Sequence, residues 1–193
     1  MEEFPKLITK RLILDQIKPK DIPDIVSYAG NIKIVENTRT MPHPYREEDA
    51  ISWMHMANQG FKNKDNYIFA MRFRDTLSFI GGIGLTLDLS NNRAELGYWL
   101  AEDFWNLGYT SEAVQAILKF GFEELNLNKV TAVYITTNNA SGKVMIKNGM
   151  TKEAEFKDHD IKKDHSIADD VYVSLLQYRM LKSEYEILKI KST

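Results

Sequence analysis

Three β-rich segments joined by short breaks occupy the middle of the chain. They read YIFAMRF, FIGGIGLTLDL and RAELGYWL, and the breaks RDTLS and SNN between them are short and turn-like. This pattern predicts an antiparallel meander of three strands. Because helical apolar spacing stands on both sides of the meander, we expect a mixed α+β sheet rather than a doubly wound one.

Helix and strand patterns of ordinary length surround the meander. One strand over 7–17 and two helices over 18–31 and 46–61 are expected before it. After it come a helix from Ser111, a strand over 129–137, a short helix from Asn138 to Gly149, two strands over 151–160 and 169–180, and a terminal helix over 181–190. No linker or repeat interrupts this order, so we expect a single domain over 1–193, with 181–193 as a helical extension.

Composition excludes several classes of function. The 25 basic and 27 acidic side chains give a net charge of −2, so no overall attraction draws nucleic acid or anionic lipid to the chain. Cysteine is absent, which excludes disulfides, thiolate metal sites and a cysteine nucleophile. The acidic start MEEFPKLITKRLIL is unlike a signal peptide, and no apolar run approaches the roughly 20 residues that span a bilayer, so we expect a cytoplasmic protein.

The stretch FWNLGYTSEAV, residues 104–114, places one glycine just before a helix start. The expected strand ends at Leu100 and the helix begins near Ser111, so the free N–H groups and positive dipole end of the helix lie beside Gly108. Such a loop binds phosphate, because glycine permits close approach of an anion and the hydroxyls of Thr110 and Ser111 add donors. The simpler alternative is a turn glycine followed by a serine cap, and this stretch alone favours it.

The surrounding motifs favour the phosphate hypothesis. AELGYWL, FWNLGYTSEA and NNAS…NGM, in this order and spacing, resemble the GNAT superfamily of acyl-CoA-dependent N-acetyltransferases, and within it the RimJ/RimL branch of ribosomal-protein N-acetyltransferases. Further matches to that branch are Thr9, Arg11, Leu12, Leu14, Pro44, Trp53 and the segment IGGIGL. The resemblance covers nearly the whole chain. It implies a mainly antiparallel central sheet of about seven strands, with helices on both faces and a splay between the fourth strand, AELGYWL, and the fifth, KVTAVYI.

The resemblance also implies how acetyl-CoA binds as a co-substrate, with no metal. Backbone N–H groups of the pyrophosphate loop would come from Leu107, Gly108, Tyr109, Thr110 and Ser111. Pantetheine would run between the splayed strands, held by main-chain groups of Tyr98, Trp99 and Leu100 and by Asn138. A physical observation points to the same strand: Gly97 inside it indicates a bulge or a close backbone approach.

Three positions of the loop depart from the branch, which usually has a second glycine after the tryptophan and then a polar or basic residue. Asn106 and Leu107 stand there instead, and Thr110 replaces the usual Ala or Gly. The backbone donors are kept. We expect the bulkier loop to reshape or weaken the grip on the cofactor.

Three polar side chains are candidates for catalysis, because acyl transfer to an amine needs a base, a polarised carbonyl and a proton donor for the leaving thiolate. Glu95 is the candidate base, directly or through water, since its strand would face the acyl group. Ser141 is the candidate acid near the thioester sulfur, with Tyr134 a weaker alternative. The structural alternatives are a solvated or salt-bridged glutamate and a serine that satisfies helix-start N–H groups. Glu112 also matches the family, but its place in the first turn of a helix assigns it to structure.

Two further segments are candidates for contact with the acceptor. His43 lies between two prolines in a loop that approaches the acceptor site in this branch, and a simply exposed histidine is the alternative. The segment DHDIKKDHSIADD gathers Asp158, His159, Asp160, Asp164, His165, Asp169 and Asp170. Its spacing fits no standard metal site, so a solvated hairpin is favoured, whose carboxylates attract a cationic amine.

The residues and the resemblance together predict an acetyl-CoA-dependent N-acetyltransferase. Direct attack by a primary amine in a ternary complex is expected, because the chain has no cysteine and no recognisable Ser-His-Asp arrangement for an acyl-enzyme. The acceptor would be a ribosomal-protein N-terminus or a small-molecule amine, with no direct nucleic-acid or membrane partner. A non-catalytic acyl-CoA-binding module is the alternative function. A monomer and a homodimer both fit.

Overall fold

Eight strands and six α-helices form the described chain, which is residues 3–164 and 169–191 of a computed structural model. The strands are β1 Leu7–Ile8, β2 Leu12–Gln16, β3 Asn66–Phe73, β4 Phe79–Asp88, β5 Arg93–Leu100, β6 Lys129–Ile135, β7 Thr151–Asp164 and β8 Asp169–Leu181. The helices are α1 Ile22–Ala29, α2 Ile32–Asn37, α3 Glu47–Asn63, α4 Tyr109–Lys119, α5 Asn139–Lys147 and α6 Lys182–Lys191.

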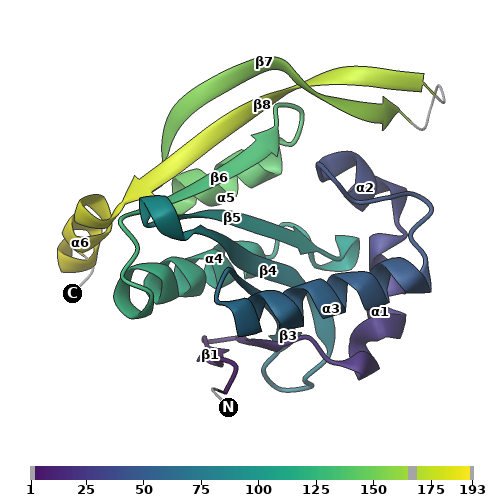
Figure 1. Cartoon of the computed structure of the whole chain (residues 1–193), viewed down its shortest axis with the longest axis horizontal. Coiled ribbons are helices and arrows are strands. Elements are labelled where there is room, and N and C mark those ends of the chain that lie inside the picture. Colours follow the sequence, from purple (N-terminus) through teal and green to yellow (C-terminus); the bar gives the residue numbers. More distant parts are fainter. Residues whose placement is uncertain (1–2, 165–168, 192–193) are drawn as a thin grey trace.

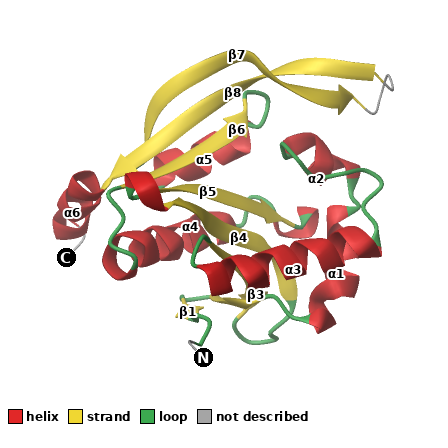
Figure 2. Ribbon diagram, viewed as in Figure 1, coloured by secondary structure: helices red, strands yellow, loops and turns green. Residues whose placement is uncertain are grey.

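The strands make one sheet at the centre of the molecule (Figures 1 and 2). Their order is β1-β2-β3-β4-β5-β6-β8-β7, and every neighbouring pair is antiparallel except β5 and β6. Helices α1 and α3 pack on one face, and α4 and α5 pack on the other. The predicted mixed α+β sheet, with its central meander of β3, β4 and β5, is confirmed.

The structure differs from the predicted elements at two places near the N-terminus. A tight turn splits the expected first strand into β1 and β2, so the sheet has eight strands rather than about seven; in this turn the Thr9 N–H donates to the Leu12 carbonyl at 2.9 Å. Helix α2 is absent from the prediction, because six residues are less than two turns and show no readable apolar period. Asn31, expected to end a helix, also begins α2, where its side chain accepts from the Lys33 N–H at 2.9 Å.

Strands β5 and β6 part after four residue pairs. Their parallel pairing runs from Arg93–Lys129 to Leu96–Ala132 and stops there. Strand β5 stays paired with β4 as far as Leu100, and β6 continues along β8. The second half of β5 therefore has no strand on its β6 side. This confirms the splay expected between AELGYWL and KVTAVYI, and it opens the sheet at its centre.

Close packing on a glycine holds α3 against the first face. A Cβ at Gly82 of β4 would lie 2.6 Å from the ring of Trp53, so only glycine lets this side chain of α3 reach the sheet. The Trp53 ring in turn lies 6.0 Å from the ring of Trp99 on β5. An aromatic layer therefore borders the place where β5 leaves β6.

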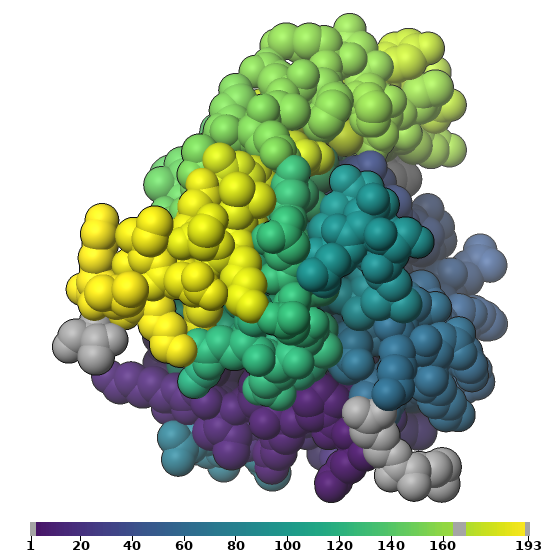
Figure 3. Space-filling view, turned by 60° about the vertical axis from the view of Figure 1, so that its left-hand side comes forward, coloured from purple at the N-terminus to yellow at the C-terminus, as the bar shows by residue number. Residues whose placement is uncertain are grey.

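The β7–β8 hairpin stands out from the body of the molecule and is fastened to α2 (Figures 1 and 3). The Lys162 ammonium donates to the carbonyls of Val35 and Thr38 at 2.6 and 2.5 Å. Just after α2, Arg39 Nε donates to the Asp160 carboxylate at 2.9 Å. Burial lowers the pKa of Lys162. The carbonyls that Lys162 binds lie at the end of α2, where the Val35 carbonyl also accepts from the Thr38 N–H at 3.2 Å. The hairpin and α2 therefore hold each other in place.

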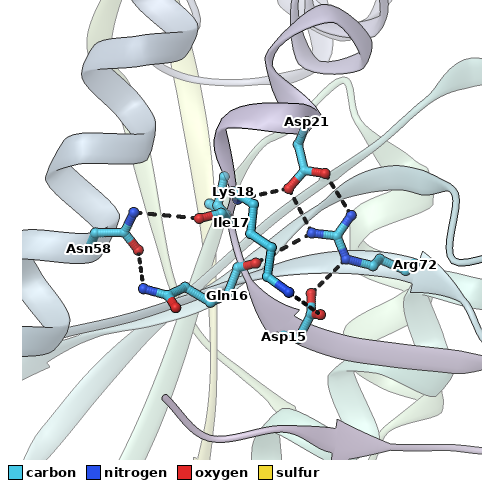
Figure 4. Close-up of polar contacts among 7 residues, drawn as sticks. All are labelled: Asp15, Gln16, Ile17, Lys18, Asp21, Asn58 and Arg72. Carbon is cyan, nitrogen blue, oxygen red and sulfur yellow. Dashed lines mark hydrogen bonds and ion pairs between the residues drawn. The ribbon is translucent and has the colours of Figure 1, made fainter. Parts of the chain in front are cut away.

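A buried arginine ties the N-terminal segment to the sheet (Figure 4). Arg72 of β3 is 2% exposed, and its guanidinium donates to Asp21 at 2.7 and 2.6 Å and to Asp15 at 2.6 Å. Asp21 was expected to cap α1 with its side chain. It does precede α1, but its carboxylate makes no cap hydrogen bond there and binds Arg72 and the Lys18 N–H instead. Such a buried pair depends on both partners being present.

Asp21→Ala is expected to lower the free energy of unfolding by about 3–5 kcal/mol, because it leaves Arg72 buried without its bidentate partner. Replacing both partners in Asp21→Leu/Arg72→Met should be less damaging than Asp21→Ala alone. Urea unfolding followed by circular dichroism measures each value. Glu153→Gln, which weakens an exposed pair with Lys129, is the control and should cost less than about 1 kcal/mol. A similarly small cost for Asp21→Ala would show that the buried pair is dispensable.

Candidate active site

A cavity of about 390 Å³ lies beside the half of β5 that leaves β6. Its walls come from the end of β5, the loop before α4, the first turn of α4, α5 and α2. The lining residues are Ile34, Asn37, Thr38, Tyr98, Trp99, Leu100, Phe104, Trp105, Asn106, Gly108, Tyr109, Thr110, Ser111, Asn138, Ala140, Ser141, Lys143, Val144 and Lys147. Most of the predicted cofactor residues and Ser141 are therefore brought together, whereas Leu107, Glu95 and Tyr134 lie outside this lining.

The loop before α4 carries a row of free backbone donors. None of the N–H groups from Leu107 to Ser111 donates to another group in the described chain. The first helical bond of α4 is made by the Glu112 N–H, which donates to the Gly108 carbonyl at 3.1 Å. Free N–H groups at the start of a helix carry a partial positive charge and suit an anion such as phosphate. The loop therefore has the free backbone N–H donors that an anion-binding loop needs.

Asn106 explains how the loop can lack its second glycine. Its backbone is left-handed, with φ 61°, and Gly108 is left-handed as well, with φ 80°. Asparagine tolerates this conformation better than most residues with a side chain, so it can stand where a glycine is usual. The neighbouring Leu107 is 54% exposed and does not line the cavity. Asn106 therefore takes the left-handed conformation of this loop without a glycine, and the effect of the bulkier side chains on cofactor binding stays a prediction.

The main chain of β5 alternates between β4 and the cavity side. The Ala101 N–H donates across to β4 at 2.9 Å, so the odd-numbered residues of β5 face β4. Trp99 thus uses its main chain inside the sheet, whereas Tyr98 and Leu100 turn theirs toward the side that β6 has left. The Leu100 carbonyl already accepts from Trp105 Nε1 at 2.8 Å. The groups left without a strand partner are the N–H and C=O of Tyr98 and the N–H of Leu100.

Asn138 joins the start of α5 to the end of α2. Its side-chain oxygen accepts from the Ser141 N–H at 3.1 Å, and its side-chain nitrogen donates to the Asn37 carbonyl at 2.9 Å. Each end of the amide makes one hydrogen bond, so a contact with pantetheine would use the second N–H of the side-chain nitrogen or the second lone pair of the side-chain oxygen. The sequence shows Asn138 as a helix start but not its link to α2.

Among the hydroxyl groups on the cavity, those of Ser141 and Tyr98 differ in their partners. The Ser141 hydroxyl has no hydrogen-bond partner in the described chain, whereas the Tyr98 hydroxyl donates to the Ser141 carbonyl at 3.2 Å. Burial raises the pKa of Tyr98 to about 12. Burial, with Tyr178 beside it, also raises the pKa of Tyr134 to about 12. Both phenols are protonated at neutral pH, but Tyr134 packs against Gly142 rather than lining the cavity.

Glu95 lies on the opposite face of β5 from α4 and α5. It shares this face with Gly97, where an added Cβ would meet nothing within 4 Å. The Glu95 side chain is 52% exposed, and Arg39 Nη1 donates to it at 3.4 Å while Arg39 Nε binds Asp160. The salt-bridged alternative for Glu95 is therefore present in the structure. Arg39 gave no signal in the sequence, because it lies in a loop without periodicity.

Within the described ranges, the residues expected to contact the acceptor, His43 and the polar residues of the β7–β8 hairpin, do not line the cavity. His43 lies exposed in the loop between α2 and α3. In the hairpin, Asp158 accepts from the Ser174 hydroxyl at 3.3 Å and Asp160 binds Arg39, while His165 lies outside the described residues. Among the residues that the structure describes, no group of three or more His, Asp or Glu side chains could hold a metal ion. Nor does the described chain contain a helix long and apolar enough to cross a membrane.

Known proteins resemble this chain in both sequence and fold. The family described as acetyltransferase (GNAT) domain matches residues 11–151. YoaA of Bacillus subtilis (strain 168), named an uncharacterized N-acetyltransferase, is 32% identical over 162 residues, 81% of this chain and 88% of YoaA. A ribosomal-protein-S5-alanine acetyltransferase from Vibrio fischeri has a TM-score of 0.78 at 17% identity, over 92% of this chain and 97% of that chain. The microcin C7 self-immunity acetyltransferase MccE, in complex with acetyl-CoA and AMP, has a TM-score of 0.77 at 16% identity, over 89% and 93%.

The comparisons and the geometry converge on one family. The family match spans most of the chain, from Arg11 beside β2 to Thr151 at the start of β7. It includes the parted strands β5 and β6 and the loop with free N–H groups before α4. The sheet and its helices have the arrangement of solved acetyltransferases of this family, such as one from Bacillus anthracis at a TM-score of 0.76. The chain belongs to the GNAT acetyltransferase family.

Proposed function

We propose that this protein transfers an acetyl group from acetyl-CoA to a primary amine, by direct attack in a ternary complex. The observation that carries the proposal is the row of free N–H groups from Leu107 to Ser111 beside the unpaired edge of β5. The row suits phosphates. The free N–H and C=O of Tyr98 suit an extended, amide-bearing arm that lies along the strand edge as an added strand would.

The charged side chains around the cavity fit an anionic co-substrate. Lys143 and Lys147 of α5 are the charged residues in the lining, as far as the chain is described, and no carboxylate joins them. Cationic side chains and helix N-terminal N–H groups both stabilise phosphate. Acetyl-CoA, when bound, supplies an activated thioester. The chain must then orient the amine and move two protons.

Glu95 and Ser141 are the proposed proton-handling residues. Glu95 stands beside the open space over Gly97, where an amine can approach the strand edge without displacing a side chain. It would take the proton of the attacking amine, directly or through water. The free Ser141 hydroxyl lines the cavity on the other side and would donate to the leaving sulfur. Tyr98 supports Ser141 by donating to its carbonyl.

The proposed acceptor is a protein N-terminus of the ribosomal kind, or a small amine. The Vibrio fischeri structural neighbour is named for acetylation of a ribosomal protein. In the present chain Glu95 and Asp160 provide carboxylates on the open face of β5, which attract a cationic amine. One observation favours a second candidate, a non-catalytic acyl-CoA-binding module: Arg39 is paired with the proposed base.

Calorimetric titration with acetyl-CoA is expected to show stoichiometric, micromolar binding. Gly108→Trp should weaken it at least about tenfold, because a side chain at φ +80° strains the loop and obstructs the anion. Gly149→Ala, equally left-handed at φ +79° but outside the cavity lining, is the control for loss of a left-handed glycine elsewhere; its Cβ would also lie 2.5 Å from Leu188 Cδ1. Desulfo-CoA should bind as well, and ATP tests whether any nucleotide suffices. A folded protein that gives no heat with acetyl-CoA at several temperatures would contradict the proposal.

Glu95→Gln is expected to lower kcat/KM for the amine by about a hundredfold or more, because the amide cannot accept a proton. It should leave the Kd for acetyl-CoA within about twofold, since Glu95 does not line the cavity. Steady-state kinetics with ribosomal-protein N-terminal peptides and polyamines measures the effect, and Glu153→Gln on β7 is the matched control. Unchanged kinetics would remove Glu95 as the base. Tight binding of acetyl-CoA without turnover of any amine would support the non-catalytic module.

Ser141→Ala is expected to lower kcat about tenfold or more through loss of the proton donor. Ser27→Ala, on the exposed side of α1, is the control. If Tyr98 were the donor, Tyr98→Phe would show this loss instead. Because burial raises the pKa of Tyr98 to about 12, that phenol would lose its proton only as the pH rises toward this value. The kcat profile from about pH 6 to pH 10 should therefore show no falling limb from Tyr98.

A further inference from the structure

The turn between β1 and β2 is joined to the first turn of α4 by three side chains, Thr9, Arg11 and Glu112, called here the Glu112 clamp. The Glu112 carboxylate accepts from the Thr9 hydroxyl at 2.6 Å, from the Arg11 N–H at 2.7 Å and from Arg11 Nε at 2.6 Å. Burial raises the pKa of Glu112, but the hydrogen bonds from Thr9 and Arg11 outweigh it and hold the pKa below its usual value. The carboxylate is a charged anchor for the guanidinium.

The anchored guanidinium reaches the loop that carries the free N–H groups. Arg11 Nη1 donates to the Leu107 carbonyl at 2.9 Å. Its central carbon lies 4.3 Å from the centre of the Tyr109 ring, and Nη2 would lie 3.5 Å from a Cβ placed on Gly108. One side chain therefore contacts Leu107 and Tyr109 and lies beside Gly108 between them. None of these contacts was visible in the sequence, where Arg11 and Glu112 stand about a hundred positions apart.

The contact with Leu107 has a geometric consequence for the donors. In a trans peptide the C=O and the following N–H point in opposite directions. Holding the Leu107 carbonyl on the side of Arg11 therefore aims the Gly108 N–H away from Arg11. The guanidinium can do this because Nε and Nη1 form a rigid fork, of which one prong binds Glu112 and the other binds Leu107.

We propose that Arg11 is a positioning residue that orients the Leu107–Gly108 peptide for the phosphates of CoA, with Glu112 as its anchor. This inference rests on the proposed function. It differs from two simpler roles: a tie that only stabilises the β1–β2 turn, and a cation that only attracts phosphate at long range. The fork geometry separates it from both, because a lysine keeps the charge but has a single nitrogen, which cannot occupy the positions of both Nε and Nη1.

Binding of CoA to Arg11→Met and Arg11→Lys, measured by calorimetry, tests the proposal. Both variants are expected to bind CoA at least about tenfold more weakly than the wild-type chain, because both lose the fork. The value of kcat/KM with S-acetylpantetheine, which lacks the phosphates, should stay within about twofold of wild type. Arg74→Met is the matched control: Arg74 donates to the Thr9 carbonyl at 3.3 Å in the same turn but makes no contact with the loop. It should leave both measurements unchanged.

Each other outcome overturns the inference in a distinct way. Wild-type affinity for CoA in Arg11→Lys would show that charge alone matters. An equal loss with CoA and with S-acetylpantetheine would show a general structural role, as would loss of the native circular dichroism spectrum in both Arg11 variants while Glu112→Gln folds and binds CoA normally. Unchanged binding in Arg11→Met would overturn the inference and leave the proposed function standing. A wild-type chain that binds no CoA would overturn the proposed function itself.

Discussion

The parting of β5 from β6 is the constraint on which the rest of the site depends. Strand β5 can leave β6 because β4 holds its other edge as far as Leu100, and β6 can leave because β8 pairs with it from Lys129 to Ile135. Backbone groups left along the gap must find partners or face water. The first residues of α4 and α5 line the same cavity, and the free N–H groups before and within the first turn of α4 add donors to this edge. The end of the β5–β6 pairing thereby leaves a row of polar backbone groups along one side of the cavity.

The short helix α2 forms a further wall of the cavity, and contacts with other elements hold it in place. Six residues are too few for α2 to be stable alone, so its position comes from tertiary contacts. Asn138 at the start of α5 donates to the Asn37 carbonyl, and Lys162 of the hairpin donates to the Val35 and Thr38 carbonyls. Hydrogen bonds therefore connect the α2 wall of the cavity to both α5 and the hairpin.

Periodicity and turn chemistry predict those parts of the fold whose determinants are local. Strand β5 has the predicted bounds, 93–100, because turns delimit it and its apolar residues alternate. The residues from Gly108 to Ser111, which the family resemblance assigns to the pyrophosphate loop, line the cavity, and their role in binding stays a prediction. Arg39 and Lys162 could not be found in this way, because their partners on the hairpin and on α2 lie 121 and 127 positions away in the sequence. A local sequence pattern cannot predict a contact between residues so far apart. Helix α2 is absent from the prediction for the same reason, because tertiary contacts rather than its own sequence stabilise it.

Charge is divided between the two faces of the opened sheet. Lys143 and Lys147 line the cavity, together with the free N–H groups of the loop, whereas Glu95 and Asp160 meet Arg39 on the opposite face. A net charge of −2 attracts neither an anion nor a cation strongly, so these local fields decide what approaches each face. In the proposed function, an anionic co-substrate and a cationic amine would be drawn to opposite sides of the same strand. Because a Cβ added at Gly97 would meet nothing within 4 Å, that proposal requires no movement of the sheet for the two to meet at the edge of β5.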